Sequence, residues 1–241
     1  MKSNDVASLT IAVVVAWSLT YPAWPASTQK ELERVPRDAL CVTNGEIGVL
    51  ANDRLTVESP SSRAVLRNMG GNAAEIRFRY LGPTQSSKPL ASGEMRRQIG
   101  IKLNAQDTCN LLYVMWHIEP DSRIAVSVKR NPGMRTHEQC GAHGYVNVKA
   151  TVHTQAQKVT PGSSHVLRAD LEGDELTVTA DGVAVWRGAL GRQLDGLSGP
   201  VGLRTDNAHF EFEFLAGGAI SPTESPRAPT GSAVCASSSG D

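Results

Sequence analysis

Hydrophobic and polar residues alternate along much of the chain in short runs that suit β-strands. The clearest series fills the stretch from residue 165 to residue 216. Its five runs are Val166–Leu171, Glu175–Ala180, Val183–Leu190, Pro200–Thr205 and His209–Leu215. Because side chains two residues apart share one face of a strand, each run predicts a strand with one buried and one solvated face.

Turn residues separate these runs. Asp181-Gly182 lies between two of them, and Glu172-Gly173-Asp174 lies between two others. An Asp-Gly pair favours a tight hairpin turn, because that turn needs positive φ angles. The last run places Phe210, Phe212 and Phe214 on one face, with glutamates between them. The pattern therefore predicts antiparallel hairpins closed by a half-buried strand.

The middle of the chain continues in the same way. Seven more runs predict strands at Arg54–Glu58, Ala64–Asn68, Glu75–Leu81, Met95–Leu103, Asn110–Ile118, Arg123–Arg130 and Tyr145–His153. One helical turn is expected before Pro36, and no long helix is expected anywhere. Closely spaced strands without long helices predict an all-β fold, a two-sheet antiparallel β-sandwich.

The order of turns adds a resemblance to a known superfamily. Between His165 and Ala216 the chain runs as strand, EGD turn, strand, DG turn, strand with a tryptophan, GPVGLRTDN and a final FEFEF strand. This order resembles the C-terminal half of a concanavalin-like (laminin G-like) jelly roll. The superfamily includes lectins, secreted binding modules and glycoside hydrolases, so the resemblance implies the fold and leaves the function open.

The run Asn110–Ile118 differs from the others because both of its faces are apolar, which is typical of a central strand. One face carries Leu112, Val114 and Trp116, and the other carries Tyr113, Met115 and His117. In a jelly roll the face of such a sheet that points away from the core forms a groove. We predict that the second set forms the floor of this groove. The predicted flanking residues are Arg77, Arg79, Gln98, Lys102, Arg123, Lys129, Tyr145 and Asn147.

These side chains indicate a ligand class. Aromatic faces beside hydrogen-bonding groups suit a sugar ring, which has apolar faces and a polar rim. Between Glu75 and Lys149 there are eleven Lys and Arg residues and six Asp and Glu residues, an excess of five positive charges, which favours an acidic glycan. The alternative is that these residues are only solvated and that Tyr113 lies under a loop.

Three functions are compatible with the pattern: a non-catalytic carbohydrate-binding module, a glycoside-processing enzyme of the same fold, and a structural or protein-interaction module. Glycosidases that retain anomeric configuration need two carboxyl groups about 5 Å apart. No predicted groove strand carries such a pair, and Glu119 and Asp121 are the best placed acids. Asp206-Asn207 could hold calcium, but the pair is more typical of a turn. We therefore favour the binding module, with no catalytic residue, cofactor or metal.

The four cysteines are Cys41, Cys109, Cys140 and Cys235. An even number in an exported chain predicts disulfides. We favour Cys109–Cys140, because the first opens the central strand and the second lies in a nearby loop. A Cys41–Cys235 bridge remains an alternative. Histidines three residues before and after Cys140 have a spacing that zinc can use, but a disulfide would consume the thiolates.

The two ends of the chain differ from the middle. Lys2, the apolar run Val6–Leu19 and a small-residue exit predict a signal peptide at 1–27, with an uncleaved anchor or a buried strand as alternatives. The segment 217–241 is rich in Ser, Pro and Gly and predicts a disordered tail. The domain is therefore expected at 28–216, in a secreted or periplasmic protein without a stable membrane span after cleavage.

The chain of 241 residues has 24 basic and 24 acidic residues, so its net charge is zero. Nucleic-acid binding proteins usually carry a basic surplus that neutralises phosphates. No such surplus exists here over the whole chain, and we predict no nucleic-acid partner. The local positive excess in the middle of the chain is instead assigned to the groove.

Overall fold

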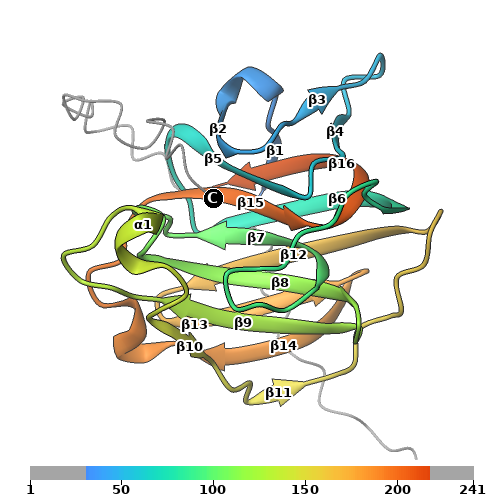
Figure 1. Ribbon diagram of the computed structural model, residues 1–241. Helices are drawn as coiled ribbons and strands as arrows, with labels where there is room; N and C mark the ends of the chain where they lie inside the picture. The colour runs from blue at the N-terminus through green and yellow to red at the C-terminus, as the bar shows by residue number, and fades with distance from the viewer. Residues whose placement is uncertain (1–30, 218–241) are drawn as a thin grey trace, which may run out of the picture.

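A computed structural model describes residues 31–217, which form two antiparallel β-sheets (Figure 1). The predicted all-β sandwich is confirmed. The predicted signal peptide at 1–27, residues 218–241 of the predicted tail, and Cys235 lie outside the described residues. Within residues 31–217, no helix is long and apolar enough to cross a membrane.

The seven-stranded sheet carries the predicted groove. Its strand order is β10-β9-β8-β7-β15-β5-β2. These strands are β2 (Leu40–Asn44), β5 (Ser61–Gly70), β7 (Arg97–Leu103), β8 (Leu111–Glu119), β9 (Arg123–Lys129), β10 (Tyr145–Asn147) and β15 (Pro200–Asp206). As predicted, β8 lies inside the sheet, paired on one side with β7 and on the other with β9.

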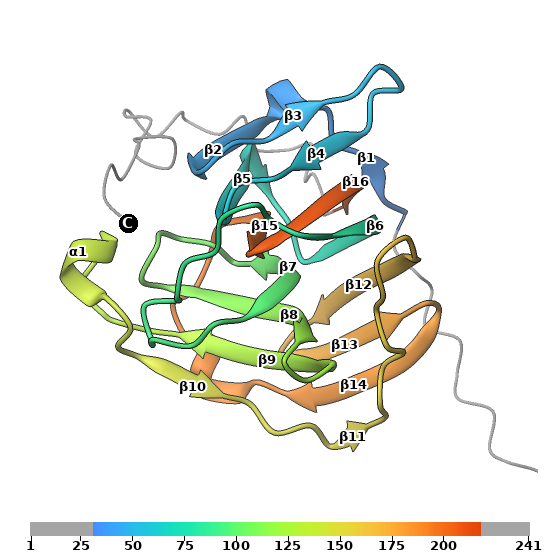
Figure 2. The same cartoon turned by 45° about the vertical axis from the view of Figure 1, so that its right-hand side comes forward.

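The nine-stranded sheet forms the second layer. Its order is β11-β14-β13-β12-β6-β16-β4-β3, and β1 also pairs with β16. These strands are β1 (Glu33–Arg34), β3 (Gly48–Val49), β4 (Leu55–Val57), β6 (Ala73–Pro83), β11 (Val152–His153), β12 (Ser164–Glu172), β13 (Glu175–Ala180), β14 (Val183–Ala189) and β16 (Ala208–Gly217). Figures 1 and 2 show β12 to β14 behind the strands β7 to β9.

Aromatic rings join the two layers. Phe210, Phe212 and Phe214 of β16 are fully buried, as the alternation predicts. The ring of Phe78 in β6 meets Phe210 edge-on at 5.5 Å and Trp116 of β8 edge-on at 5.7 Å, measured between ring centroids. Such edge-to-face pairs stabilise a core beyond the burial of their apolar area. The core therefore lies between the sheets, and the outer face of the seven-stranded sheet stays available for other contacts.

The predicted hairpins form at the predicted turns. Asp181 and Gly182 connect β13 to β14 with φ angles of 51° and 80°. Gly173, with a φ of 62°, connects β12 to β13. Positive φ is the conformation that Gly and Asp tolerate best in tight turns. These local signals were sufficient to place β12, β13 and β14 side by side.

The predicted strand Tyr145–His153 is wrong as a single element. It is divided into β10, at the edge of the seven-stranded sheet, and β11, at the edge of the nine-stranded sheet. Val146 was expected in the core but is 48% exposed. The reason is that β10 is an edge strand that pairs only with β9, so its alternation does not report burial.

Short elements near the start of the domain also differ from the prediction. The helical turn is a 3-10 helix at η1 (Arg37–Ala39), which follows Pro36 instead of preceding it. Proline fixes its own φ near the helical value and disfavours helix in the residue before it, so a turn begins more easily after it. The strands β1, β2 and β3 were not predicted, and β1 lies within the stretch where the helical turn was expected. The remaining short helices are α1 (His137–Cys140) and η2 (Gly191–Leu194).

Candidate functional site

The two apolar faces of β8 lie on opposite sides of the seven-stranded sheet. Leu112, Val114 and Trp116 point into the core between the sheets and are fully buried. Tyr113, Met115 and His117 point the other way, onto the outer face of the seven-stranded sheet. The same face carries the outward residues of the paired strands, because residues directly opposite in an antiparallel pair share a face. The faces of β8 are therefore as predicted.

A groove of about 700 Å³ lies over β8, β9 and β10 on this outer face and extends past β9 to the core-side residues Ile124, Val126 and Trp186. Seven of the eleven predicted site residues line it: Gln98, Tyr113, Met115, His117, Arg123, Tyr145 and Asn147. The groove is large enough for a short oligosaccharide or a similar small ligand, which typically occupies several hundred cubic ångströms. The predicted floor strand and its two neighbours therefore meet in one cavity.

The loop between β6 and β7 forms one wall of the groove. Between β6 and β7 the chain supplies Leu90, Ala91, Ser92, Glu94 and Arg96 to the lining. Asn207, which has a φ of 54°, fixes this loop. The Asn207 side chain donates to the carbonyls of Lys88 at 2.8 Å and Arg96 at 3.1 Å, and accepts from the Lys88 amide at 2.9 Å.

Two tyrosines stack at the groove. The rings of Tyr113 and Tyr145 lie 6.1 Å apart at an angle of 23°. Tyr145 is 41% exposed, whereas Tyr113 is 5% exposed. The guanidinium of Arg204 lies 5.3 Å from the centre of the Tyr113 ring. Tyr145 is therefore the more exposed of the two rings, and Nζ of Lys129 lies 5.2 Å from its centre.

Arg204 belongs to a buried polar network at the floor. Its Nε donates to Oδ2 of Asp206 at 2.7 Å, and Nε2 of Gln98 donates to the same oxygen at 2.6 Å. Ser61 donates to the other carboxylate oxygen at 3.3 Å. The oxygens of Asp206 are thus engaged by protein donors, which agrees with a turn at Asp206-Asn207 better than with a calcium site. Oε1 of Gln98 is buried and accepts no hydrogen bond from the described residues.

His117 is held neutral in the groove. Burial is the largest cause that lowers its pKa to about 3, and nearby arginine charges lower the pKa further. These arginines are Arg96, Arg123 and Arg204. Nη1 of Arg96 lies 3.2 Å from Nε2 of His117, which fits a neutral ring that accepts the bond.

This pKa predicts a loss of stability in mild acid. In the folded protein the pKa of His117 lies below the ordinary value of about 6.5. Below pH 6.5 the imidazole is therefore protonated in the unfolded chain but stays neutral in the folded chain. Unfolding free energy should therefore fall by about 2 to 3 kcal/mol between pH 6.5 and 4.5 through His117 alone. Urea titrations at several pH values check this. In His117→Gln this part of the acid slope should disappear; equal slopes in both proteins would contradict the assignment.

Four predicted site residues do not reach the groove. Lys102 and Lys129 lie on the correct sheet, but they are 4% and 1% exposed and do not line the cavity. Nζ of Lys129 donates to the carbonyls of Thr108 at 3.2 Å and Gly141 at 2.8 Å. Flexible lysine stems can reach backbone carbonyls in this way, and alternation alone does not reveal it.

Arg77 and Arg79 are wrong for a different reason. Both belong to β6, which is part of the nine-stranded sheet, so they point to the opposite side of the molecule. There they stand directly across from Glu213 and Glu211 of β16. Opposite charges at facing positions stabilise an antiparallel pair. The alternation showed correctly that both arginines point outward, but it did not show from which sheet.

Sequence reasoning also missed residues that line the groove. Besides the loop residues, these include Ser127, Ala142, Lys149, His153, Trp186 and Arg204. Arg204 carried a usable signal, because the alternation of β15 places it on the face opposite Leu203. The others come from segments whose contact with the groove depends on the fold. Among the described residues that line the groove, Glu94 is the only carboxylate.

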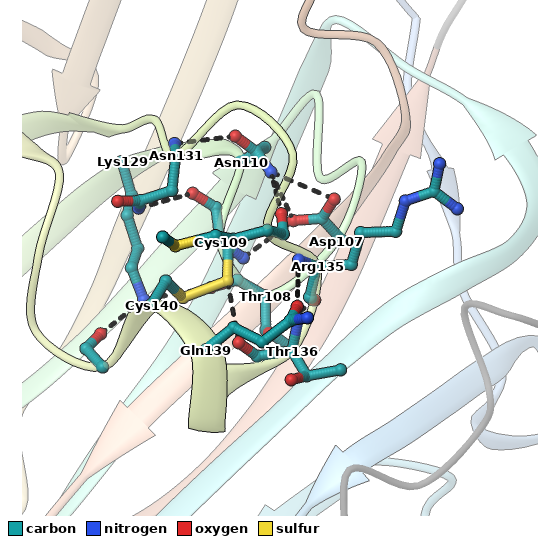
Figure 3. The surroundings of a disulfide bond; sticks show 12 residues. Asp107, Thr108, Cys109, Asn110, Lys129, Asn131, Arg135, Thr136, Gln139 and Cys140 are labelled. Atoms are coloured by element: carbon teal, nitrogen blue, oxygen red, sulfur yellow. Dashed lines mark hydrogen bonds between the residues drawn. A yellow bond between two sulfur atoms is a disulfide. The ribbon is translucent and has the colours of Figure 1, made fainter.

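The predicted disulfide Cys109–Cys140 is confirmed and ties the α1 loop to the start of β8 (Figure 3). Figure 3 also shows Asn110 and Asn131 bonded beside it, with the Asn131 amide donating to the Asn110 side chain at 2.8 Å. Because both sulfurs are bonded to each other, they are not available as thiolate ligands beside His137 and His143.

A serine, a histidine and an aspartate also meet outside the groove. Oγ of Ser163 lies 2.8 Å from Nε2 of His165, whose Nδ1 lies 2.8 Å from Oδ2 of Asp181. However, the Ser163 hydroxyl donates its single proton to the Thr160 carbonyl at 2.6 Å. Asp181 also accepts from the Val166 amide. These hydrogen bonds hold the turn at Thr160–Ser163 against the hairpin turn at Asp181, and they do not activate the Ser163 hydroxyl as a nucleophile.

Comparison with known proteins agrees at the level of the fold. No protein-family profile and no curated protein sequence matches the chain. Among solved structures, a carbohydrate-binding module, CBM66, from Bacillus subtilis matches with a TM-score of 0.50 and 11% identity, over 72% of this chain and 91% of the module. At 11% identity this likeness concerns the fold alone, a two-sheet antiparallel β-sandwich.

Two further structures are similar to a lower degree. The metal-free carbohydrate recognition domain of Emp46p matches with a TM-score of 0.48 and 11% identity, over 76% of this chain and 90% of that chain. A putative glycosyl hydrolase from Parabacteroides distasonis matches with a TM-score of 0.48 and 10% identity, over 78% and 99%. At such identities the likeness concerns the fold, and function has to be argued from the groove.

Proposed function

We propose that this protein is an exported, non-catalytic module that binds an acidic carbohydrate in the groove over β8, β9 and β10. The observation that carries the proposal is the exposed ring of Tyr145, stacked on Tyr113 at the edge of that groove. A flat aromatic surface packs against the apolar face of a sugar ring. Gln98, with its unpartnered buried Oε1, and Asn147 supply hydrogen-bonding groups around it.

The charge of the groove supports an anionic ligand. Arg96, Arg123 and Lys149 line it together with Arg204, and Glu94 is the lining carboxylate. Glu94 is paired with Arg96, and Arg204 is paired with Asp206. Arg123 and Lys149 therefore contribute the net positive charge, and a guanidinium can hold a carboxylate through two parallel hydrogen bonds. A uronic acid or another carboxylate sugar has this chemistry.

Two more features support export and a binding role. A disulfide such as Cys109–Cys140 persists in oxidising compartments, which agrees with a secreted or periplasmic protein. A second carboxylate beside Glu94 would be required for glycoside hydrolysis by the two-acid mechanism. The runner-up acids, Glu119 and Asp121, do not line the groove, and Glu119 is paired with Arg97. The glycosidase and the protein-interaction module remain the competing functions.

Substitutions on matched positions test the proposal. Tyr145→Ala should weaken glycan binding about tenfold through lost stacking, since such contacts contribute about 1–1.5 kcal/mol. Val146→Ala, on the same exposed strand but the opposite face, is the control. Arg123→Gln should weaken the binding of acidic glycans about 10- to 100-fold and leave that of neutral glycans unchanged, because charge-assisted bonds contribute about 1.5–3 kcal/mol. Arg79→Gln, on the other sheet, is its control.

The measurement is a glycan array on residues 28–241, followed by calorimetric titration of the hits at low and high salt. Added salt should weaken binding of acidic glycans, because it screens exposed charges. If no glycan on the array binds, carbohydrate binding is contradicted, and the protein-interaction module becomes the favoured function. Hydrolysis of a bound glycan that stops in Glu94→Gln would establish the glycosidase instead.

A further inference from the structure

The groove does not end at the edge of β9. Strand β10 pairs with β9 only along residues 127–129, and after Asn147 the chain leaves β9 and joins the other sheet at β11. Within the described chain, no strand therefore pairs with residues 123–125 on the side away from β8. Figures 1 and 2 show the segment 148–153 running from β10 to β11 along this edge of the sandwich. We call the part of the groove between β9 and this segment the side arm.

Apolar side chains line the side arm. They line the groove and also belong to the core between the sheets or pack against it: Ile124, Val126, Val148, Ala150 and Trp186. The indole of Trp186 lies over Gly188, where a Cβ atom would come within 2.9 Å of the indole Cη2. Because Gly188 has no side chain, the indole packs directly on the backbone of β14. The core therefore reaches the groove at this edge of the sandwich.

The side arm is narrow. Ile124, Val126 and Trp186 are each at most 5% exposed, which leaves room for a group of a few atoms rather than for a whole sugar ring. A hydroxyl group in these surroundings would lose its hydrogen bonds to water without replacing them. Apolar cavities in proteins stay free of water and accept apolar guests instead. The side arm therefore suits a short apolar group.

Cations stand beside the side arm. Arg123 precedes Ile124 in β9, and both line the groove. Lys149 lies between Val148 and Ala150 in the crossing segment, and all three line the groove. The two cations are exposed, whereas their apolar neighbours are buried or half-buried. A ligand that enters the side arm from this part of the groove therefore has an anionic body with a short apolar branch.

We propose that the side arm holds a short acyl group that is ester-linked to the acidic glycan in the groove. This inference rests on the proposed carbohydrate function and names the ligand more closely, as an O-acylated acidic polysaccharide. Acetyl is the smallest such group. Its methyl contacts the indole of Trp186, while carboxylates of the polysaccharide bind Arg123 and Lys149. A free fatty acid also combines an anionic head with an apolar tail, so the experiment has to separate these two sources.

Matched pairs of polymers test the side arm on the unmodified protein. Polygalacturonate and polymannuronate are each titrated by calorimetry with and without chemical O-acetylation. Burial of one methyl group strengthens binding about fourfold, so the acetylated polymer of each pair should bind about 4- to 10-fold more tightly. Equal affinity for both members would overturn the side arm and leave the carbohydrate function in place. Tighter binding of octanoate than of either acetylated polymer would assign the side arm to a lipid and also overturn the proposal.

A substitution that fills the side arm provides a second test. Ala150→Leu should remove the preference for the acetylated polymer, so that both members of a pair bind equally. Ala184→Leu, at an exposed position of β14 outside the groove, is the matched control and should keep the preference. Thermal unfolding shows whether each variant is folded. A preference that persists in folded Ala150→Leu would contradict the position of the acyl group.

Methyl acetate tests the side arm without any glycan. In NMR spectra of the folded protein, the methyl signal of Ala150 and the indole N–H signal of Trp186 should shift as methyl acetate is added. Methanol at the same concentration should leave both signals in place. The methyl signal of Ala74, a fully buried residue of β6, is the internal control. If neither signal shifts, the side arm is overturned even where glycans bind; if both shift and no glycan binds, the apolar arm stands and the carbohydrate function fails.

Discussion

Replacing Arg204 by methionine should lower the free energy of unfolding by about 3–5 kcal/mol, because the change leaves a buried carboxylate without its cation. Asp206 is 1% exposed and Arg204 is 8% exposed, so neither charge is solvated to any extent. The Arg204 Nε donates to Asp206 at 2.7 Å. Its guanidinium also packs over the Tyr113 ring at 5.3 Å. Urea denaturation of the variant measures the loss.

A double-mutant cycle separates the ion pair from the packing. Asp206→Asn alone should also destabilise the fold, because Arg204 then lacks its counter-ion. Arg204→Met combined with Asp206→Leu should cost less than the sum of the single changes, since no charge is left buried without a partner. Single changes that cost less than about 1 kcal/mol would mean that water reaches this network. Arg79→Gln on the nine-stranded sheet provides the exposed arginine for comparison.

Removing the Cys109–Cys140 disulfide should cost about 3–4 kcal/mol at 25 °C. The bond joins residues separated by 31 positions, so the unfolded chain gains the entropy of an opened loop. The double substitution Cys109→Ala with Cys140→Ala is the appropriate variant, because it leaves no free thiol at this place. Thermal or urea unfolding, compared with the unmodified protein, gives the difference.

Loss of the Cys109–Cys140 disulfide should also increase the mobility of the loop that leads into the groove. The α1 loop continues through Ala142 to Tyr145, both of which line the groove, and Lys129 donates to the Gly141 carbonyl in that loop. Amide exchange over residues 137–144 should therefore become faster in the alanine variant, whereas exchange in β13 should stay slow. Unchanged stability together with unchanged exchange would show that hydrogen bonds alone, such as that from Lys129, hold the loop.

Local patterns predicted most of the strands, because the signals they need are local. The alternation of Phe210, Phe212 and Phe214 predicted a strand with one buried face, and Asp181-Gly182 predicted the hairpin between β13 and β14. The outer face of β8 was also correctly assigned, since a strand with two apolar faces lies inside a sheet. Each of these features depends on residues within a few positions of one another.

The same patterns failed where long-range pairing decides. Arg77 and Arg79 have the alternation of groove residues, yet β6 pairs with β12 and β16 in the other sheet. Val146 alternates as a core residue, but β10 is an edge strand. A period of two residues identifies two faces of a strand; it contains no information on which sheet the strand joins or how far inside it lies.

The sequence by itself determined the sandwich, the hairpins, the favoured disulfide and the floor strand of the groove. Only the tertiary structure decided which charges meet there. The loop that carries Arg96 reaches the groove because Asn207, far away in the chain, holds its backbone. Lys129 is buried below the Tyr145 ring because the carbonyls of two other segments accept hydrogen bonds from its ammonium group. Both outcomes depend on contacts between segments distant in sequence, which become defined only when the chain folds.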